Sequence, residues 1–231
     1  MTSPRGSAQG HPPRPARHTR DDVAETALRI LDEHGLPELT MRRLAAALDV
    51  QPSALYWHFP NKQTLLAELS DRIASRGRAL PAAGSGPGAA AGDWMIVTAA
   101  EAQSLRDALL AYRDGAEVVS SSFALGLGAS VPLTRLRAAI GRGKFDDETA
   151  SRASAALLHF ILGHVSHEQQ RLQYDSLGVA AGLQTDEGTS AFDFGVLLFI
   201  QGLAQHAPSR PGTSTHSHTI GESISAPTGR F

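Results

Sequence analysis

The stretch LTMRRLAAALDVQPSALYWHFPNK, residues 39–62, decides the fold of this 231-residue chain. Thr40 is a good N-cap for a short helix, and Pro52 suits the first position of another. Asp49 lies in a turn of about three residues between these two helices. The inward positions of the unit are all apolar: Leu44, Ala45, Leu48, Val50 and Leu55. The pattern predicts a helix-turn-helix, a unit that places its second helix in the major groove of DNA.

The outward positions of the second helix have the side chains that such a contact needs. They are hydrogen-bonding or flat groups, suited to bases and phosphates: Gln51, Ser53, Tyr56, Trp57 and His58. Lys62 follows at the start of the next helix, where its charge and the helix N-terminus can both reach a phosphate. An alternative is that Tyr56 and Trp57 are core aromatics.

Helical patterns extend on both sides of this stretch. Gly35 ends an upstream helix, one face of which carries Val23, Ala27, Ile30, Leu31 and His34. Asn61 caps a downstream helix, one face of which carries Leu65, Leu66, Leu69 and Ile73. Further helical patterns cover residues 93–111, 131–140, 147–172 and 191–206. No strand pattern of any length is visible, so we predict an all-α protein with a three-helix N-terminal domain and a larger helical regulatory and dimerisation domain.

Composition narrows the class of protein. Hydrophobic residues make up 42% of the chain, enough for a core, and the absence of cysteine excludes a disulfide framework, a cysteine-based zinc site and a thiol nucleophile. Residues 1–78 have 11 basic and 9 acidic side chains (net +2), whereas residues 79–231 have 10 and 14 (net −4), which together give the formal charge of −2. The N-terminal region has no apolar signal segment and no apolar run is long enough to cross a bilayer, so a cytoplasmic location is the default.

The chain divides by composition into five segments. We predict a disordered basic arm over 1–19, a helix-turn-helix domain with its connecting helix over 20–78, a flexible joint over 79–92, a ligand-binding and dimerisation domain over 93–206, and a disordered tail over 207–231. The arm is either a solubilising tail or an additional phosphate contact. Helices 147–172 and 191–206 are expected to form a four-helix bundle with their two-fold mates. The alternative is that they are the buried core of the domain, and the two interpretations are compatible.

The sequence LTMRRLAAALDVQPSALYWHFPNKQTLLAEL, residues 39–69, resembles the DNA-binding domain of the tetracycline-repressor (TetR) family, with LYWHFPNK as its most specific run. The resemblance continues in ALLAYRDGAEVV (108–119), LLHFILGHVSHEQQ (157–170) and AFDFGVLLFIQGL (191–203), which are similar to the regulatory domain of the tetracycline repressors themselves. It implies a homodimeric repressor that binds a near-palindromic operator and that a small-molecule effector releases.

By carry-over at matching positions, the resemblance implies eight DNA contacts: Arg42, Pro52, Ser53, Ala54, Tyr56, Trp57, His58 and Lys62. We expect Arg42 to bind a guanine in a bidentate manner and Tyr56, His58 and Lys62 to hold phosphates. Pro52 and Ala54 are suited to a thymine methyl group. The family usually has glycine where this chain has Asp49; aspartate tolerates left-handed backbone angles, so we expect the turn to survive.

The same carry-over places Glu101, Leu105, Val119 and His167 at the effector site of the family. We predict Ser122 and His164 as further effector contacts. Tetracycline repressors bind a drug–magnesium chelate, but their metal-contacting histidine is matched by Val119 and a partner-supplied glutamate by His167. Magnesium prefers oxygen ligands, so we predict a different, metal-free effector and no cofactor. His164 and His167 are expected to line the pocket or to be otherwise satisfied, not to bind metal, because their spacing is not that of a zinc hydrolase.

Competing functions were weighed on the same residues. No arrangement of serine, histidine and aspartate in the C-terminal half suggests an enzyme, so we predict none. A constitutive DNA-binding regulator without a ligand, or an activator, is an alternative that the residues leave open. A cavity lined by Leu105, Ser122, His164 and His167 would favour a ligand-responsive regulator over both the enzyme and the constitutive regulator.

Overall fold

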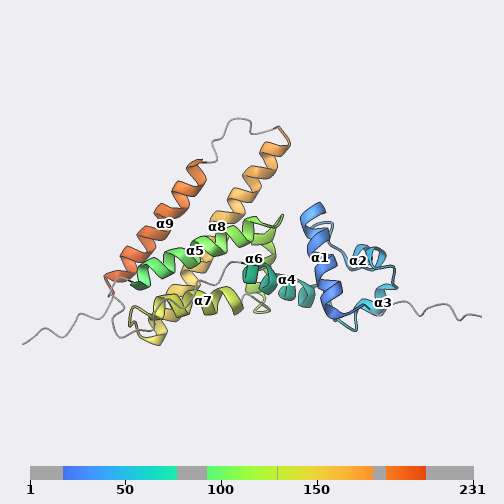
Figure 1. Ribbon diagram of the computed structural model, residues 1–231, viewed down its shortest axis with the longest axis horizontal. Coiled ribbons are helices and arrows are strands. Elements are labelled where there is room, and N and C mark those ends of the chain that lie inside the picture. The colour runs from blue at the N-terminus through green and yellow to red at the C-terminus, as the bar shows by residue number, and fades with distance from the viewer. Residues whose placement is uncertain (1–17, 77–92, 129, 179–185, 207–231) are drawn as a thin grey trace, which may run out of the picture.

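The computed structural model describes residues 18–76, 93–128, 130–178 and 186–206. These residues form α-helices and no strand (Figure 1), so the predicted all-α class is confirmed. The helices are α1 (Arg20–His34), α2 (Met41–Ala47), α3 (Pro52–Leu55), α4 (Lys62–Arg76), α5 (Asp93–Leu110), α6 (Gly115–Ala124), α7 (Ser130–Gly141), α8 (Asp147–Ser176) and α9 (Asp186–Ala204). Most of the predicted arm, the joint and the tail lie outside the described residues.

The ends of α1 and α2 follow local sequence signals. Thr19 and Asp22 form a capping box at the start of α1, in which each side chain accepts a hydrogen bond from the other residue's backbone N–H. Gly35 ends α1 with a φ of 84°. Thr40 caps α2 by accepting a hydrogen bond from the backbone N–H of Arg43. The predicted caps at Thr40 and Gly35 are therefore confirmed.

The turn between α2 and α3 has the predicted geometry. Asp49 has a φ of 53°, in the left-handed region, and Pro52 is the first residue of α3. The helix itself is shorter than the sequence pattern suggests, because α3 ends at Leu55 and the chain continues as a turn to Phe59. Leu55 and Phe59 are both buried and fix this segment to the domain core.

The helix α4 connects the two domains. It packs against α1 on the N-terminal side and against α5, α6 and α7 on the C-terminal side. Figure 1 shows α4 between the group α1–α3 and the remaining helices. The helix α4 therefore has contacts with both domains.

The C-terminal domain contains one helix that the sequence analysis did not predict. This helix, α6, follows Asp114, which has a left-handed φ of 56°, and begins at Gly115, where a Cβ atom would lie 2.4 Å from the carbonyl oxygen of Leu109. Gln169 of α8 holds the preceding loop by donating to the carbonyls of Leu109 and Tyr112 and accepting from the backbone N–H of Ala116. Tertiary contacts, more than helix propensity, thus support α6.

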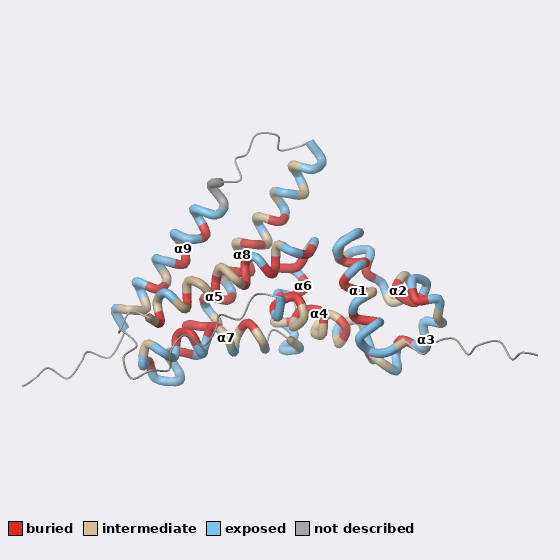
Figure 2. The backbone as a smooth tube through the Cα atoms, viewed as in Figure 1, coloured by how far each residue is buried: buried red, intermediate tan, exposed pale blue. Residues whose placement is uncertain are grey.

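The long helices α8 and α9 lie side by side and extend beyond the rest of the domain (Figure 1). Gly195 permits their close approach, because a Cβ atom there would lie 2.3 Å from the ring of Phe160. Their outward faces are exposed, whereas their inward faces join the core (Figure 2). Near the start of α5, Trp94 is buried and packs edge-on against Phe145, with ring centroids 5.0 Å apart.

Candidate nucleic-acid interface and regulatory site

The segment that follows the α2–α3 turn presents large side chains to solvent. Trp57 is 90% exposed and Tyr56 is 49% exposed, so the alternative that they are core aromatics is wrong. The other predicted contacts in this segment are either exposed or half-buried: Pro52, Ser53, Ala54 and His58. The structure thus gathers six of the eight predicted DNA contacts on one short segment.

Two cations flank this segment. Arg42 is exposed on α2 and Lys62 is half-buried at the first residue of α4, and neither forms a hydrogen bond or ion pair within the described part of the chain. The neighbouring Arg43 differs, because it is paired with Glu38 at 2.5 Å. Arg42 and Lys62 therefore keep their charge available for an anionic partner.

The position of the exposed segment depends on Arg20, which the sequence analysis did not single out. Its guanidinium donates to the carbonyl oxygen of His58 at 3.0 Å, lies 4.3 Å from the ring centre of Phe59 and pairs with Glu68 at 3.1 Å. The first contact joins residues 38 positions apart, so no local pattern signals it. Arg20 is a positioning residue for the surface that contains Tyr56 and Trp57.

An ion-pair cluster holds α1 against α4. Arg72 of α4 binds Asp21, Glu25 and Glu68, the last two at 3.2 and 2.9 Å. Partial burial by itself raises the pKa of Glu68, but hydrogen bonds from Arg72 and Arg20 outweigh it, so this pKa lies below its ordinary value. The cluster keeps α4 and α1 in one orientation while the carboxylates are ionised.

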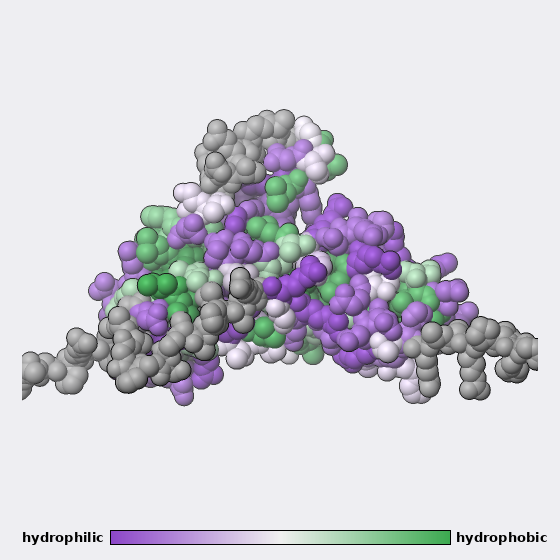
Figure 3. All heavy atoms as spheres, viewed as in Figure 1, coloured by the Kyte–Doolittle hydropathy of each residue, from purple (hydrophilic) through white to green (hydrophobic). Residues whose placement is uncertain are grey.

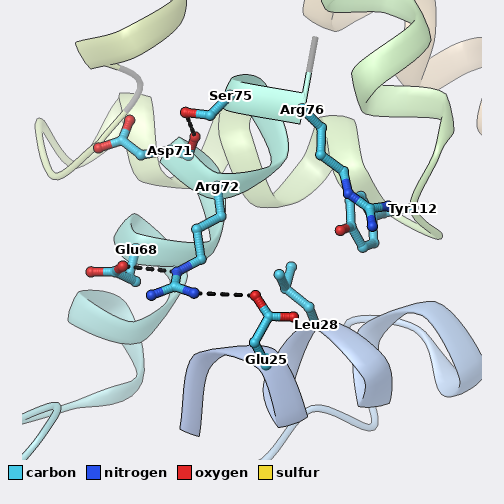
Figure 4. Close-up of a pocket in the computed structure, with 8 residues that line it drawn as sticks. All are labelled: Glu25, Leu28, Glu68, Asp71, Arg72, Ser75, Arg76 and Tyr112. Atoms are coloured by element: carbon cyan, nitrogen blue, oxygen red, sulfur yellow. Dashed lines mark hydrogen bonds and ion pairs between the residues drawn. The ribbon is translucent and has the colours of Figure 1, made fainter. Parts of the chain in front are cut away.

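A cleft of about 440 Å³ lies at the junction of the two domains, between α1, α4 and the loop before α6 (Figure 4). At one end of it, the guanidinium of Arg76 stacks over the ring of Tyr112, 5.0 Å from its centre. Burial raises the pKa of the Tyr112 hydroxyl. The last residue of α4 is thus tied to the C-terminal domain by a side-chain contact.

The predicted effector residues are distributed over three helices. Four of them are buried on α5 and α6: Glu101, Leu105, Val119 and Ser122. His164 is half-buried on α8 against the rings of Phe160 and Phe192, whereas His167 is exposed. Neither the junction cleft nor a second pocket of about 240 Å³ beside the end of α8 is lined by any of the six. Their assignment stays a prediction.

Two partly buried arginine–glutamate pairs cross the C-terminal domain, and neither is predicted from the sequence. Arg135 of α7 binds Glu101 of α5, and Arg106 of α5 binds Glu168 of α8. The partners are 34 and 62 residues apart, beyond the reach of helix periodicity. Glu101, predicted only as an effector contact, is therefore also one partner of a buried ion pair.

No group of three or more histidine, aspartate or glutamate side chains among the described residues is placed to hold a metal ion. In the same part of the chain, none of the helices has the length and apolar character needed to span a membrane.

Comparison with known proteins agrees with this architecture. The family model for bacterial regulatory proteins of the tetR family matches residues 23–69, and that for the tetracyclin repressor-like C-terminal domain matches residues 86–179. Tetracycline repressor protein class D of Escherichia coli is 36% identical over 157 residues, which are 67% of this chain and 68% of that protein.

Solved structures show the same similarity over most of the chain. Mycobacterium smegmatis BioQ is 39% identical with a TM-score of 0.72, and BioQ with its natural double-stranded DNA operator is 37% identical with a TM-score of 0.67; both cover 82% of this chain and 99% of theirs. A TetR variant from Acinetobacter baumannii AYE in complex with minocycline is 34% identical with a TM-score of 0.62, covering 83% and 99%. The chain therefore belongs to the TetR family of bacterial transcriptional regulators.

Proposed function

We propose that this chain is a homodimeric repressor that binds a near-palindromic operator and that a small-molecule effector releases from DNA. The observation that carries the proposal is the exposed segment with Tyr56 and Trp57. It is flanked by Arg42 and Lys62, whose side chains have no ion-pair partner among the described residues. Such a surface offers both base contacts and phosphate contacts. The operator complex of BioQ, a relative of similar fold, supports this use of the N-terminal domain. A DNA target also favours a cytoplasmic location.

The DNA contacts divide into two kinds. Arg42 is proposed to read a guanine, since its planar guanidinium can donate two hydrogen bonds to one base edge. Tyr56, His58 and Lys62 are proposed to hold phosphates, which fixes the register of the protein on the duplex. Smaller neighbours and the exposed indole complete the surface: Pro52, Ser53, Ala54 and Trp57. Domain limits of 20–78 and 93–206 are part of the same proposal.

Dimerisation is proposed to use the outward faces of α8 and α9. Phe194, Leu197 and Leu198 are each at least 50% exposed on α9, and hydrophobic surface gathers along this helix in Figure 3. An apolar face of this kind, beside an equally exposed face of α8, is suited to a second copy in a four-helix bundle. Two copies would then present two exposed segments to the two half-sites of an operator.

Effector control is proposed to reside in the C-terminal domain. The minocycline complex of a relative supports a ligand site in this domain, but Val119 and His167 replace the metal-contacting side chains that the family resemblance implies. We therefore propose an effector other than a tetracycline–magnesium chelate. The competing function, a constitutive DNA-binding regulator or an activator, predicts no compound-dependent release from the operator.

A footprint on the DNA upstream of the protein's own gene, taken over a series of salt concentrations, tests the proposal. We expect a protected near-palindrome whose binding constant falls steeply with salt, with a slope near −0.9 per phosphate contact. The alanine variant of Trp57, which is exposed and has little role in folding, should protect less at equal concentration. Binding without sequence preference would contradict the repressor function.

A further inference from the structure

The guanidinium of Arg135 joins three helices, and one of them is α4. Its Nε and Nη2 atoms lie 2.8 and 2.6 Å from Oε2 of Glu101 on α5, and Nη2 donates to the hydroxyl of Ser104 at 3.2 Å. Its Nη1 atom donates to the carbonyl oxygen of Ala74, in the last turn of α4, at 3.2 Å. We call Arg135, Glu101, Ser104 and Ala74 the Arg135 cluster.

The contact with Ala74 links the Arg135 cluster to α4, and α4 packs against the N-terminal domain. The last carbonyls of a helix have no partner within the helix, so a cation placed there stabilises the helix end. Because α4 is a continuous helix of 15 residues, a shift at Ala74 is carried to Lys62 at its first residue. The cluster can therefore set where Lys62 and the neighbouring DNA-contacting segment lie.

A buried polar atom beside this ion pair is left for another partner. The two contacts of Glu101 with Arg135 described above use Oε2. The hydroxyl of Thr98 is fully buried without a hydrogen-bond partner and lies one turn before Glu101 on the same face of α5. Buried polar groups nearly always have a partner, so the Thr98 hydroxyl, beside the carboxylate of Glu101, indicates a place for a polar group of a bound molecule.

We propose that the effector has a cationic nitrogen group on an apolar body, and that it acts by taking Glu101 from Arg135. The inference rests on the proposed effector control and names its chemistry. A cation on Glu101 neutralises the carboxylate and repels the guanidinium, so the pair opens and Arg135 shifts on the Ala74 carbonyl. Leu105, buried one turn after Glu101, is suited to an apolar ligand body. An anionic effector would instead bind Arg135 itself.

The second buried pair supplies a matched control. Arg106 and Glu168 are buried to a similar extent, but Arg106 also binds Thr189 and lies over the ring of Phe192, both on α9, and none of these partners lies on α4. Loss of either pair leaves a buried charge without a partner and lowers thermal stability. Only loss of the Arg135 pair should also change DNA binding by the protein that remains folded.

The first test needs no ligand. Operator binding is titrated by gel shift at low temperature for Glu101→Gln and Arg135→Gln, with Glu168→Gln as the control, and circular dichroism measures the folded fraction. We expect about tenfold weaker operator binding per folded Arg135→Gln protein, a smaller loss for Glu101→Gln and none for the control. Equal operator affinity in all three variants would overturn the role of the cluster.

The second test uses 2-naphthylmethylamine and 2-naphthoate at equal millimolar concentration as probes. The amine is expected to release wild-type protein and Glu168→Gln from the operator, and to need about tenfold higher concentration for Glu101→Gln. Release by naphthoate instead, an unchanged amine response in Glu101→Gln, or no response to either probe would overturn the proposal. Operator binding by wild-type protein without probe tests the proposed function separately, so the two failures are distinguishable.

Discussion

Two surfaces of this protein expose large side chains, and they differ in what surrounds those side chains. Tyr56 and Trp57 stand among hydrogen-bonding groups and beside the uncommitted cations Arg42 and Lys62. Phe194 and Leu198 on α9 stand in an apolar face. We propose a contact surface in both places. The neighbouring charges favour a polyanion as the partner of the first surface, and the apolar surroundings favour a second apolar face as the partner of the second.

The largest effect is expected on the apolar surface. Leu197→Glu places a carboxylate on α9, and a two-fold dimer would bring two such carboxylates into its interface. An unpaired buried charge costs about 3–5 kcal/mol, so the dimer dissociation constant should rise by at least about a hundredfold. Analytical ultracentrifugation measures the change. Leu125→Glu, at a leucine that is similarly exposed but lies at the end of α6, is the control and should stay dimeric. A dimeric Leu197→Glu protein would refute the assignment.

The next effect concerns base recognition at the polar surface. Arg42→Ala should weaken operator binding by about 1–3 kcal/mol and relax specificity at one base pair, because the bidentate contact is lost. Competition binding with operators substituted at each position measures this. Arg29→Ala, which removes another exposed cation from α1, should leave specificity unchanged. If Arg42→Ala keeps the same ratio of operator to random-DNA affinity, Arg42 does not read a base.

Lys62 should behave differently from Arg42, since a phosphate contact has no sequence information. Lys62→Ala is expected to weaken binding to operator and random DNA by the same factor and to reduce the salt slope by about one. Titrations at several salt concentrations with both DNAs provide the measurement. If Lys62→Ala weakens binding to the operator more than binding to random DNA, Lys62 contacts a base and not only a phosphate.

The smallest expected effect is a pH dependence of stability that involves the N-terminal domain and not the apolar face of α8 and α9. The pKa of Glu68 is lowered in the folded protein, so the stability it adds is present above its unfolded pKa, near 4.5, and is lost as the pH falls through the folded value. Urea unfolding at decreasing pH should show the N-terminal domain weakening, and Glu68→Gln should flatten that decline. The apolar face of α8 and α9 does not depend on this cluster. An unchanged pH profile in Glu68→Gln would disprove the linkage.

Short-range signals in the sequence predicted the N-terminal domain well. Thr40, Asp49 and Pro52 act within a few residues of themselves, so their roles can be derived from the sequence. Contacts between distant residues could not be predicted, as with Arg20 on the carbonyl of His58 or Arg135 on Glu101. The helix α6 could not be predicted either, because its start is stabilised by Gln169 of α8, which is distant in the sequence.

The candidate DNA contacts came from a specific local motif and from the family resemblance of that motif, and six of the eight lie on one short segment. Four of the six effector residues came from resemblance, and the arrangement of all six depends on how α5, α6 and α8 pack. Periodicity places Glu101 and Leu105 on one face of α5 but cannot show that the carboxylate is paired with Arg135. Side-chain pairing across helices is set by tertiary packing, which no single segment of sequence specifies.

The opposite environments of the two tryptophans, the only ones in the chain, have a spectroscopic consequence. Trp57 is exposed on the segment that is proposed to contact DNA, so its emission should lie to the red and be quenched when DNA covers the indole. Trp94 is buried against Phe145, so its emission should lie to the blue and shift only when the C-terminal domain unfolds. Unlabelled protein thus has one intrinsic fluorophore for binding and another for folding.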